Sequence, residues 1–115
     1  MANLPDTTYG ELLLWLLRRR KRLRVDGESM LPLLQPGDEI LFAPHAYKKS
    51  KPQLEDVIVA SHPLQNNLTI VKRVINIEGD RYFVVGDNRT SSTDSRHWGK
   101  IELANIIGRV TSKFN

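Results

Sequence analysis

The chain has 115 residues, of which 40% are apolar and 26% are charged, a balance typical of a single globular domain with one core. It has no cysteine, which excludes disulfides and thiolate metal sites, and its three histidines show no ligand spacing, so we expect no metal and no other cofactor. The formal net charge is +4, yet six of the seventeen lysines and arginines lie in residues 18–24 and the rest of the chain is mildly acidic.

The first predicted element is a helix from about Tyr9 to Arg20. Thr8 is in the N-cap position, and Glu11 three residues later suits a capping box. The fully apolar stretch, residues 12–17, is six residues long, whereas about 20 are needed to cross a bilayer. The positive charges follow this stretch instead of preceding it, so we expect neither a transmembrane anchor nor a signal peptide.

The basic run RRRKRLR occupies residues 18–24. We interpret it as a solvated helix end, where cations favour the helix dipole; the alternative is a surface that meets the phosphates of lipids or of nucleic acid. Residues 9–24 could also lie on a membrane with Trp15 as anchor, pack on the domain or bind a partner, and the sequence leaves these open. Residues 1–24 are thus predicted to be a helix and basic segment, and residues 25–115 to be the folded domain.

The next segment, VDGESMLPLLQPGD at residues 25–38, suits neither a long helix nor a strand. Pro32 biases the residue before it away from the helical region, Gly27 permits unusual dihedral angles, and the segment ends in a Pro-Gly turn. Ser29 therefore lies in a loop with a restricted backbone. Taken alone, it would simply cap one helical turn over residues 30–34.

From residue 39 onward the pattern is one of short strands separated by turns. Five segments are rich in β-branched and aromatic residues, which predicts a mainly β domain with an antiparallel or mixed, coiled or barrel-like sheet. Glu78-Gly79-Asp80 is expected to join the third and fourth strands in a hairpin. The five segments are EILFA (39–43), DVIVAS (56–61), LTIVKRVINI (68–77), RYFVVG (81–86) and IIGRVTS (106–112), with a polar loop at 45–53.

The third strand carries two adjacent basic residues. Alternation sends Lys72 and Arg73 to opposite faces, so at least one lies among apolar neighbours. A lysine at an exposed sheet edge is the ordinary interpretation. A desolvated Lys72 would instead have a lowered pKa and offer a neutral amine that can accept a proton. The predicted faces are Ile70, Lys72 and Val74 on one side, and Val71, Arg73, Ile75 and Ile77 on the other.

The segment GDNRTSSTDSRHWG, residues 86–99, is too rich in turn formers and polar groups for a strand interior. Asp94 and Arg96 can pair across a short bend. The segment also contains several serine and threonine hydroxyl groups, among them that of Ser92, and these could orient an amine. On its own this segment predicts only a polar loop.

Together, GESMLPLLQPGD, IVKRV and GDNRTSSTDSR resemble, in this order, the conserved boxes of the type I signal peptidase family, serine proteases that use a Ser-Lys dyad. The resemblance covers about residues 25–112. It implies a small, coiled, barrel-like β core with Ser29 as nucleophile and Lys72 as general base. Ser29 would then need a stiff loop so that its hydroxyl is aimed at a peptide carbonyl.

The resemblance also implies roles for the surrounding residues. Ser92 would orient the lysine amine, while Asp94 and Arg96 would brace the loop beneath the site. An apolar, shallow surface formed in part by Met30 and Leu31 would accept small side chains of an extended substrate bound by strand addition.

One departure from the family pattern concerns the oxyanion. Many members carry a serine two residues before the nucleophile as a second oxyanion donor. This chain has Gly27 there, which leaves the backbone N–H of Ser29 as the donor.

Only 13 residues separate Lys72 from Gly86, so the large extra domain of long signal peptidases is not expected. A short version with ELLLWLLRRRKRLR near its N-terminus is similar to the nickel-type superoxide dismutase maturation proteases. This resemblance implies one protein partner, the precursor of a nickel superoxide dismutase, from which the protease removes the N-terminal propeptide. It further implies a cytoplasmic protein, soluble or peripherally membrane-bound, with no nucleic-acid partner.

Other functions are open from the sequence. A small general type I signal peptidase would use the same chemistry on secretory precursors, and a non-catalytic β-barrel module would bind phosphate-rich partners through the basic run. A self-cleaving repressor with a Ser-Lys dyad fits less well, because the 28 residues before Ser29 are too few for a DNA-binding domain and the chain has no Ala-Gly bond to cut.

Overall fold

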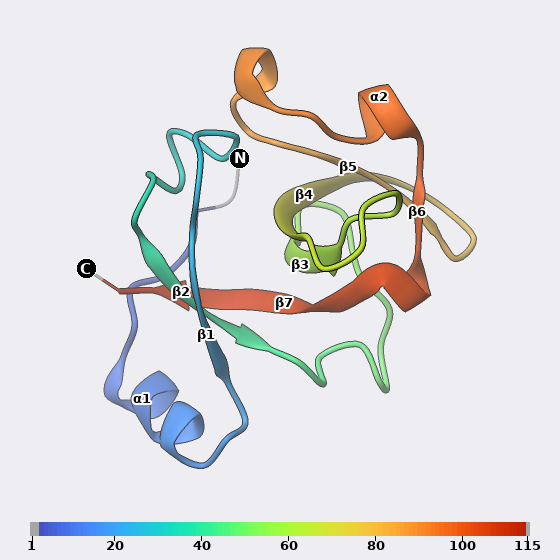
Figure 1. The fold of residues 1–115 in the computed structure, drawn as a ribbon. Helices are drawn as coiled ribbons and strands as arrows, with labels where there is room; N and C mark the ends of the chain where they lie inside the picture. The colour runs from blue at the N-terminus through green and yellow to red at the C-terminus, as the bar shows by residue number, and fades with distance from the viewer. Residues whose placement is uncertain (1–2, 115) are drawn as a thin grey trace.

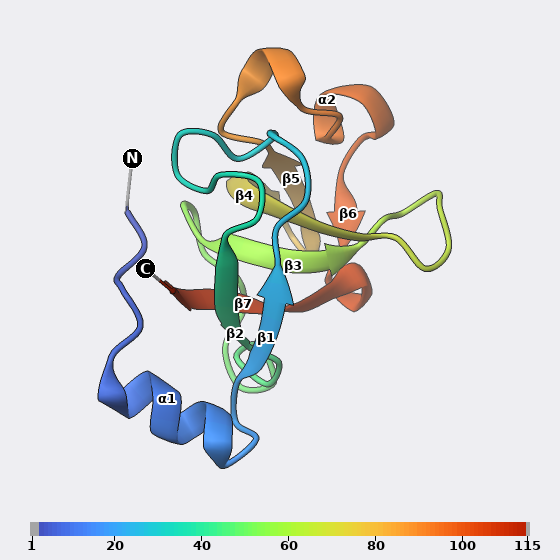
Figure 2. The same ribbon diagram turned by 60° about the vertical axis from the view of Figure 1, so that its left-hand side comes forward.

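The computed structural model describes residues 3–114, and over these residues one seven-stranded antiparallel sheet, curled into a half-barrel, carries the fold (Figures 1 and 2). The order of strands across the sheet is β1-β2-β7-β3-β4-β5-β6. This confirms the predicted mainly β class. The strands are β1 (Lys21–Arg24), β2 (Glu39–Ala43), β3 (Val57–Ser61), β4 (Thr69–Glu78), β5 (Arg81–Val85), β6 (Ile101–Glu102) and β7 (Ile106–Lys113), and the helices are α1 (Tyr9–Leu16) and α2 (Ser95–Trp98).

All five predicted strands are present within a residue or so of their predicted bounds, but the N-terminal helix is shorter than predicted. It ends at Leu16 instead of Arg20, because Arg18 adopts a left-handed φ of 63° that reverses the chain. Residues 21–24 of the basic run then form the edge strand β1, paired antiparallel with β2. The interpretation of the whole run as a solvated helix end is therefore wrong.

The sequence of strand β1 lacks the alternation of apolar residues that predicts a strand, and tertiary contacts hold this strand in place. The Arg22 guanidinium forms an ion pair with Glu39 of β2 and lies 4.2 Å from the ring centre of Phe114 and 5.1 Å from that of Trp15. The partners come from distant parts of the chain. A basic segment thus joins the sheet because of its ion pair and its contacts with aromatic rings. Local strand propensity does not predict such contacts.

Helix α1 begins as predicted, with the Thr8 hydroxyl accepting the N–H of Glu11. The Glu11 carboxylate does not complete the predicted capping box. It instead accepts hydrogen bonds from the hydroxyls of Thr111 and Ser112 on β7 and from the guanidinium of Arg20. One carboxylate therefore fastens the helix to the sheet.

The hairpin between β4 and β5 forms as predicted, with Glu78 paired to Arg81 and Gly79 at a φ of 61°. A bulge between Val74 and Asn76 interrupts the alternation. Beyond it, Ile77 pairs with Tyr82, whose side chain belongs to the same cluster as Val74, so the predicted placement of Ile77 on the opposite face is wrong.

Apolar clusters lie on both faces of the curled sheet, and adjacent residues of one strand serve both. This arrangement sends Lys72 and Arg73 to opposite faces, as predicted, and buries both of them. The first cluster contains Val25, Met30, Leu34, Ile40, Phe42, Val57, Val59 and Val110, and the second contains Ile58, Ala60, Val74, Tyr82, Val84 and Ile101.

Candidate active site

Ser29 lies in the loop that joins β1 to β2, and this loop is closed at its base. The Val25 N–H donates to the Asp38 carbonyl (2.7 Å), and the Gly37 N–H donates to the Val25 carbonyl (2.8 Å). Met30 is fully buried in the first cluster, and its carbonyl accepts the N–H of residue 34 to form the predicted helical turn. Ser29 therefore sits one residue from a core anchor, which restricts where its hydroxyl can point.

The segment after β5 holds the serine loop from the other side. The backbone N–H of Asn88 donates to the Ser29 carbonyl (2.9 Å), and the Asn88 side-chain amide donates to the Glu28 carbonyl (3.1 Å). Gly86 permits this close approach, since a Cβ there would lie 2.4 Å from the Ser29 carbonyl oxygen and 2.3 Å from Ser92 Oγ. The sequence predicted only a polar loop over residues 86–99, so it missed the part that Gly86 and Asn88 play in positioning Ser29.

Lys72 comes from the middle of β4 and is 5% exposed. Its amine donates to the hydroxyl of Ser92 (3.1 Å). Burial lowers the pKa of Lys72 because the ammonium loses hydration, the charge of Asp94 acts in the opposite direction, and the charge of Arg96 lowers the pKa further. The edge-lysine interpretation is therefore wrong, and the desolvated lysine is the one observed.

A polar cluster after β5 supports the lysine. The Ser92 hydroxyl donates to Asp94 Oδ2 (2.6 Å), and the N–H of Gly86 lies within hydrogen-bond distance of both Ser92 Oγ (3.1 Å) and Asp94 Oδ2 (3.0 Å). The Arg96 guanidinium donates to both carboxylate oxygens, at 2.9 and 3.0 Å. Burial alone would raise the pKa of Asp94, but the hydrogen bonds from Arg96, Ser92 and Gly86 outweigh it and hold that pKa well below its usual range.

This cluster contains a helix where the sequence predicted only a loop. Asp94 caps α2 through the N–H of Arg96 (3.2 Å), and the Ser95 hydroxyl accepts the N–H of Val84 in β5 (2.9 Å). The helix is one turn long, too short for a periodic sequence signal. The structure thus brings together Lys72, Ser92, Asp94 and Arg96 as one hydrogen-bonded unit.

Sequence reasoning also missed an ion pair behind the site. The Arg73 guanidinium donates twice to the Asp87 carboxylate, at 2.9 and 3.0 Å, and once to the Glu55 carbonyl (3.1 Å). Arg73 and Asp87 are almost fully buried. Because Asp87 precedes Asn88, the pair fixes the start of the segment that holds the serine loop. The signal that could have found it is a second basic residue beside Lys72 in an otherwise apolar strand.

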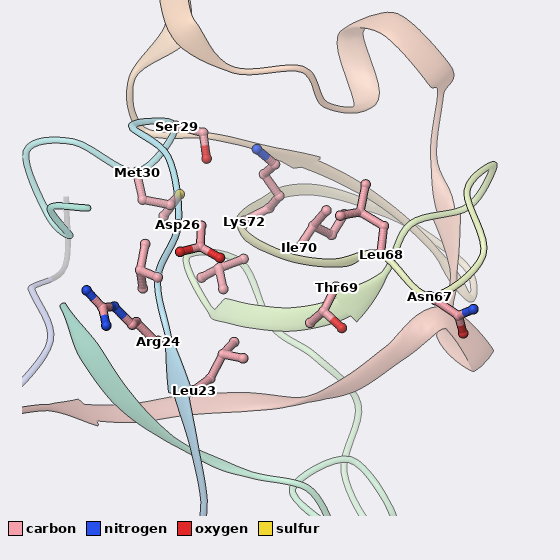
Figure 3. A pocket seen from close by; sticks show the side chains of 12 residues that line it. Leu23, Arg24, Asp26, Ser29, Met30, Asn67, Leu68, Thr69, Ile70 and Lys72 are labelled. Carbon is pink, nitrogen blue, oxygen red and sulfur yellow. The ribbon is translucent and has the colours of Figure 1, made fainter. Parts of the chain in front are cut away.

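A cleft of about 450 Å³ passes beneath Ser29 and Lys72 (Figure 3). Figure 3 shows the two side chains converging at one end of the cleft. Met30 lines the cleft, whereas Leu31 lies outside the lining set. The walls are partly apolar and partly polar, and comprise Leu23, Arg24, Val25, Asp26, Ser29, Met30, Asn67, Leu68, Thr69, Ile70, Val71 and Lys72.

Two observations concern metals and membranes. In residues 3–114, no group of three or more histidine, aspartate or glutamate side chains is placed to hold a metal ion. Over the same part of the chain, no helix has the length and apolar character needed to cross a bilayer.

A hydroxyl and a desolvated amine at one cleft are the groups used by serine hydrolases that pair the nucleophile with a lysine. The comparison with known families agrees: residues 12–81 and 76–114 match the model of the family described as signal peptidase, peptidase S26. The chain belongs to this family.

The chain is similar to curated proteases of plants, bacteria and animals. It is 33% identical over 107 residues to the mitochondrial ATP-independent inner membrane protease subunit 1b of Arabidopsis thaliana, covering 73% of this chain and 63% of that protein. It is 29% identical over 135 residues to signal peptidase I of Leptolyngbya laminosa, covering 78% and 66%. It is 32% identical over 108 residues to the mouse mitochondrial inner membrane protease subunit 1, covering 76% and 64%. The chain thus spans somewhat less than two thirds of these relatives.

Proposed function

We propose that this protein is a serine endopeptidase in which Ser29 is the nucleophile and Lys72 the general base. The observation that carries the proposal is the buried Lys72 amine, hydrogen-bonded to Ser92 at the cleft that Ser29 also lines. Burial favours the neutral amine, and only the neutral amine can take a proton from a hydroxyl.

The hydrogen-bond directions supply the positioning. The Ser92 hydrogen is committed to the ionised Asp94, so Ser92 Oγ can only accept from the Lys72 amine. One N–H of Lys72 is thereby directed at Ser92, and the lone pair of the neutral amine is left for the hydrogen of Ser29. Ser92 is on this account a positioning residue, which Asp94 and Arg96 hold in place.

The reaction follows from this geometry. Ser29 Oγ attacks the peptide carbonyl carbon as Lys72 Nζ takes the hydroxyl proton, and Lys72 then gives that proton to the leaving amine nitrogen as the C–N bond breaks. Water hydrolyses the acyl ester in the second half, with Lys72 again as base. The Ser29 N–H makes no hydrogen bond within residues 3–114 and is the oxyanion donor we propose, since the residue two positions earlier is Gly27.

The cleft suits a substrate bound as an added strand. Strand β1 is an edge of the sheet, and over residues 69–72 strand β4 pairs with β3 but not with β5, whose pairing begins at Arg73. A peptide between these two edges would find backbone partners and point alternate side chains into the cleft, with Met30 as an apolar contact. Leu31, the other predicted substrate contact, lies outside the residues that line this cleft, and its contact with substrate stays a prediction.

For the substrate, we propose the precursor of a nickel superoxide dismutase, whose N-terminal propeptide would be removed in the cytoplasm. The support is the sequence resemblance to the maturation proteases, together with the two-residue β4–β5 hairpin that leaves the catalytic core compact. A general signal peptidase acting on secretory precursors is the second candidate, favoured by relatives that are named signal peptidase I.

The dyad is tested by substitution. Ser29→Ala and Lys72→Ala should each abolish cleavage, and the double variant should be no worse than either single one, because the two groups act as a unit. Lys72→Arg should also be inactive, since a guanidinium keeps its proton at working pH. Circular dichroism and urea unfolding check that each variant folds, and cleavage by a folded Lys72→Ala protein would refute the assignment.

The substrate is tested by mass spectrometry of new N-termini after mixing the purified protein with each precursor separately. Cleavage of the nickel superoxide dismutase precursor alone, absent with Ser29→Ala, supports the dedicated protease. Cleavage of the secretory precursor alone supports the general signal peptidase. Cleavage of neither would support the non-catalytic binding module.

A further inference from the structure

Helix α1 turns an apolar stripe toward solvent. Its inner face is half-buried, but Tyr9, Leu13, Leu16 and Leu17 are 92%, 56%, 75% and 60% exposed. These residues are spaced i, i+4, i+7 and i+8, which places them on one face of the helix. Figure 2 shows α1 at the periphery of the molecule, beyond the first residues of β1. Four large apolar side chains in one exposed stripe indicate a binding surface.

Two residues that follow the stripe in the chain, Arg19 and Arg20, line a pocket of about 300 Å³ with a cationic lining. The side chains of Arg19 and Arg109 make no hydrogen bond or ion pair within the described residues 3–114, and Arg20 is paired with Glu11. No aspartate or glutamate lines the pocket. Arg19 and Arg109 carry like charges that repel each other, so an anion bound between them is stabilised. The full lining is Arg19, Arg20, Ala43, His45, Ala46 and Arg109.

A second hollow continues the basic surface around the end of the helix. It is lined by Trp15, Arg18, Arg20, Lys21 and Arg22 and shares Arg20 with the first pocket. Trp15 lies edge-on to Phe114, with 6.0 Å between the ring centres, so its ring is held against the C-terminal end of β7. The stripe, the ring and the arginines therefore follow one another along residues 9–22.

We propose that this surface binds an anionic membrane: the α1 stripe enters the acyl-chain boundary, and a lipid phosphate occupies the pocket between Arg19, His45 and Arg109. Arg18 and Arg19 follow Leu17 directly, so the basic side chains lie next to the apolar stripe along the chain. A free phosphate or a nucleic acid would use the arginines but gain nothing from exposed leucines. An interfacial helix needs both features.

The surface is separate from the candidate active site. The pocket lies at Ala43, the last residue of β2, whereas the serine loop precedes the first residue of that strand. The variants that test it therefore leave Ser29, Lys72 and their partners unchanged, and the inference does not depend on the proposed peptidase activity.

The experiment is co-sedimentation of the full chain with vesicles of phosphatidylcholine alone and with added phosphatidylglycerol. We expect binding to the anionic vesicles only, weakened by salt. One basic residue at such a surface is worth about 1 kcal/mol, so Arg19→Ala and Arg109→Ala should each lower partitioning about five-fold. Leu16→Ser should lower it about ten-fold through lost apolar burial.

Matched controls separate position from composition. Arg81→Ala removes an exposed arginine from β5, and Leu64→Ser removes a leucine that is 74% exposed in the β3–β4 loop; neither should change partitioning. If inorganic phosphate displaces the protein from the vesicles and Leu16→Ser binds them as well as wild type does, the pocket is a site for free phosphate and the membrane proposal is overturned. Failure to bind anionic vesicles at low salt would also overturn the membrane proposal. If, in addition, the α1 variants slow the processing of the precursor, the surface docks a protein instead.

Discussion

Burial of the Lys72 amine sets the pH range in which the proposed peptidase works. Because the neutral amine is the base, kcat/KM for a peptide should rise with pH through the lowered pKa of Lys72 and fall away below it. The profile is measured with a fluorogenic peptide between pH 5 and 10 (about five units, wide enough to bracket a lowered lysine pKa). A rate that is flat across this range would contradict the assignment.

The same shift links stability to pH, with a definite sign. The folded pKa of Lys72 lies below its unfolded value of about 10.4, so between the two pKa values the unfolded chain binds more protons. The free energy of unfolding therefore rises with pH through that window. Urea titrations of wild type and Lys72→Met should differ in this slope, because methionine has no proton to gain; equal slopes would show that Lys72 is not desolvated.

Gly86 is the residue on which the Ser29 and Ser92 contacts converge. A methyl group there would lie under 3 Å from both partners, so Gly86→Ala should displace the serine loop, lower the unfolding free energy by about 1–3 kcal/mol and reduce kcat at least ten-fold. Gly10→Ala is the matched control, since its Cβ meets only ordinary contact at 3.6 Å and helix propensity favours alanine. An active Gly86→Ala protein would mean that the loop tolerates displacement.

At the scale of elements, α1 depends on Glu11 for its contact with β7. Glu11→Ala removes the acceptor of the Thr111, Ser112 and Arg20 hydrogen bonds, at a cost of about 1–2 kcal/mol. Amide hydrogen exchange should then speed up in residues 9–16 while the sheet keeps its protection, because few other contacts hold the helix. Faster exchange throughout the sheet would show instead that α1 is part of the cooperative core.

The β5–α2 segment acts as a clamp on the serine loop. Strand β5 ends at Val85, the chain turns at Gly86, and Asn88 reaches the backbone on either side of the Glu28–Ser29 bond. Asp94 then caps α2 and anchors the returning chain. The proposed nucleophile, base and base-orienting serine come from three separate segments of the chain, and this clamp holds them in their relative positions.

For the whole molecule, the two apolar clusters share one sheet, so they should unfold together. Leu34→Ala in the first cluster and Ile58→Ala in the second each remove a fully buried side chain and should cost about 2–5 kcal/mol. Both variants should show one urea transition by fluorescence and by circular dichroism, since β3 and β4 contribute to both clusters. Two separate transitions in either variant would show that the clusters are independent.

The sequence by itself determined the strands with strong β-branched content, the β4–β5 turn, the separation of Lys72 from Arg73 and the motifs of the family. These are local properties: side-chain alternation, turn chemistry and short motifs act over a few residues and can be counted along the chain. The candidate site residues were marked in the same way, by three motifs with fixed spacing.

Tertiary structure decided the rest. Strand β1 forms because Arg22 contacts Glu39 and two aromatic rings. Helix α1 ends early because the chain turns to pair with β2, and the one-turn helix α2 forms because Asp94 caps it. The desolvation of Lys72 is likewise a property of what surrounds β4. Burial, ion pairing and close backbone approach are long-range quantities, so they depend on which distant segments meet and have no signature within a local stretch of sequence.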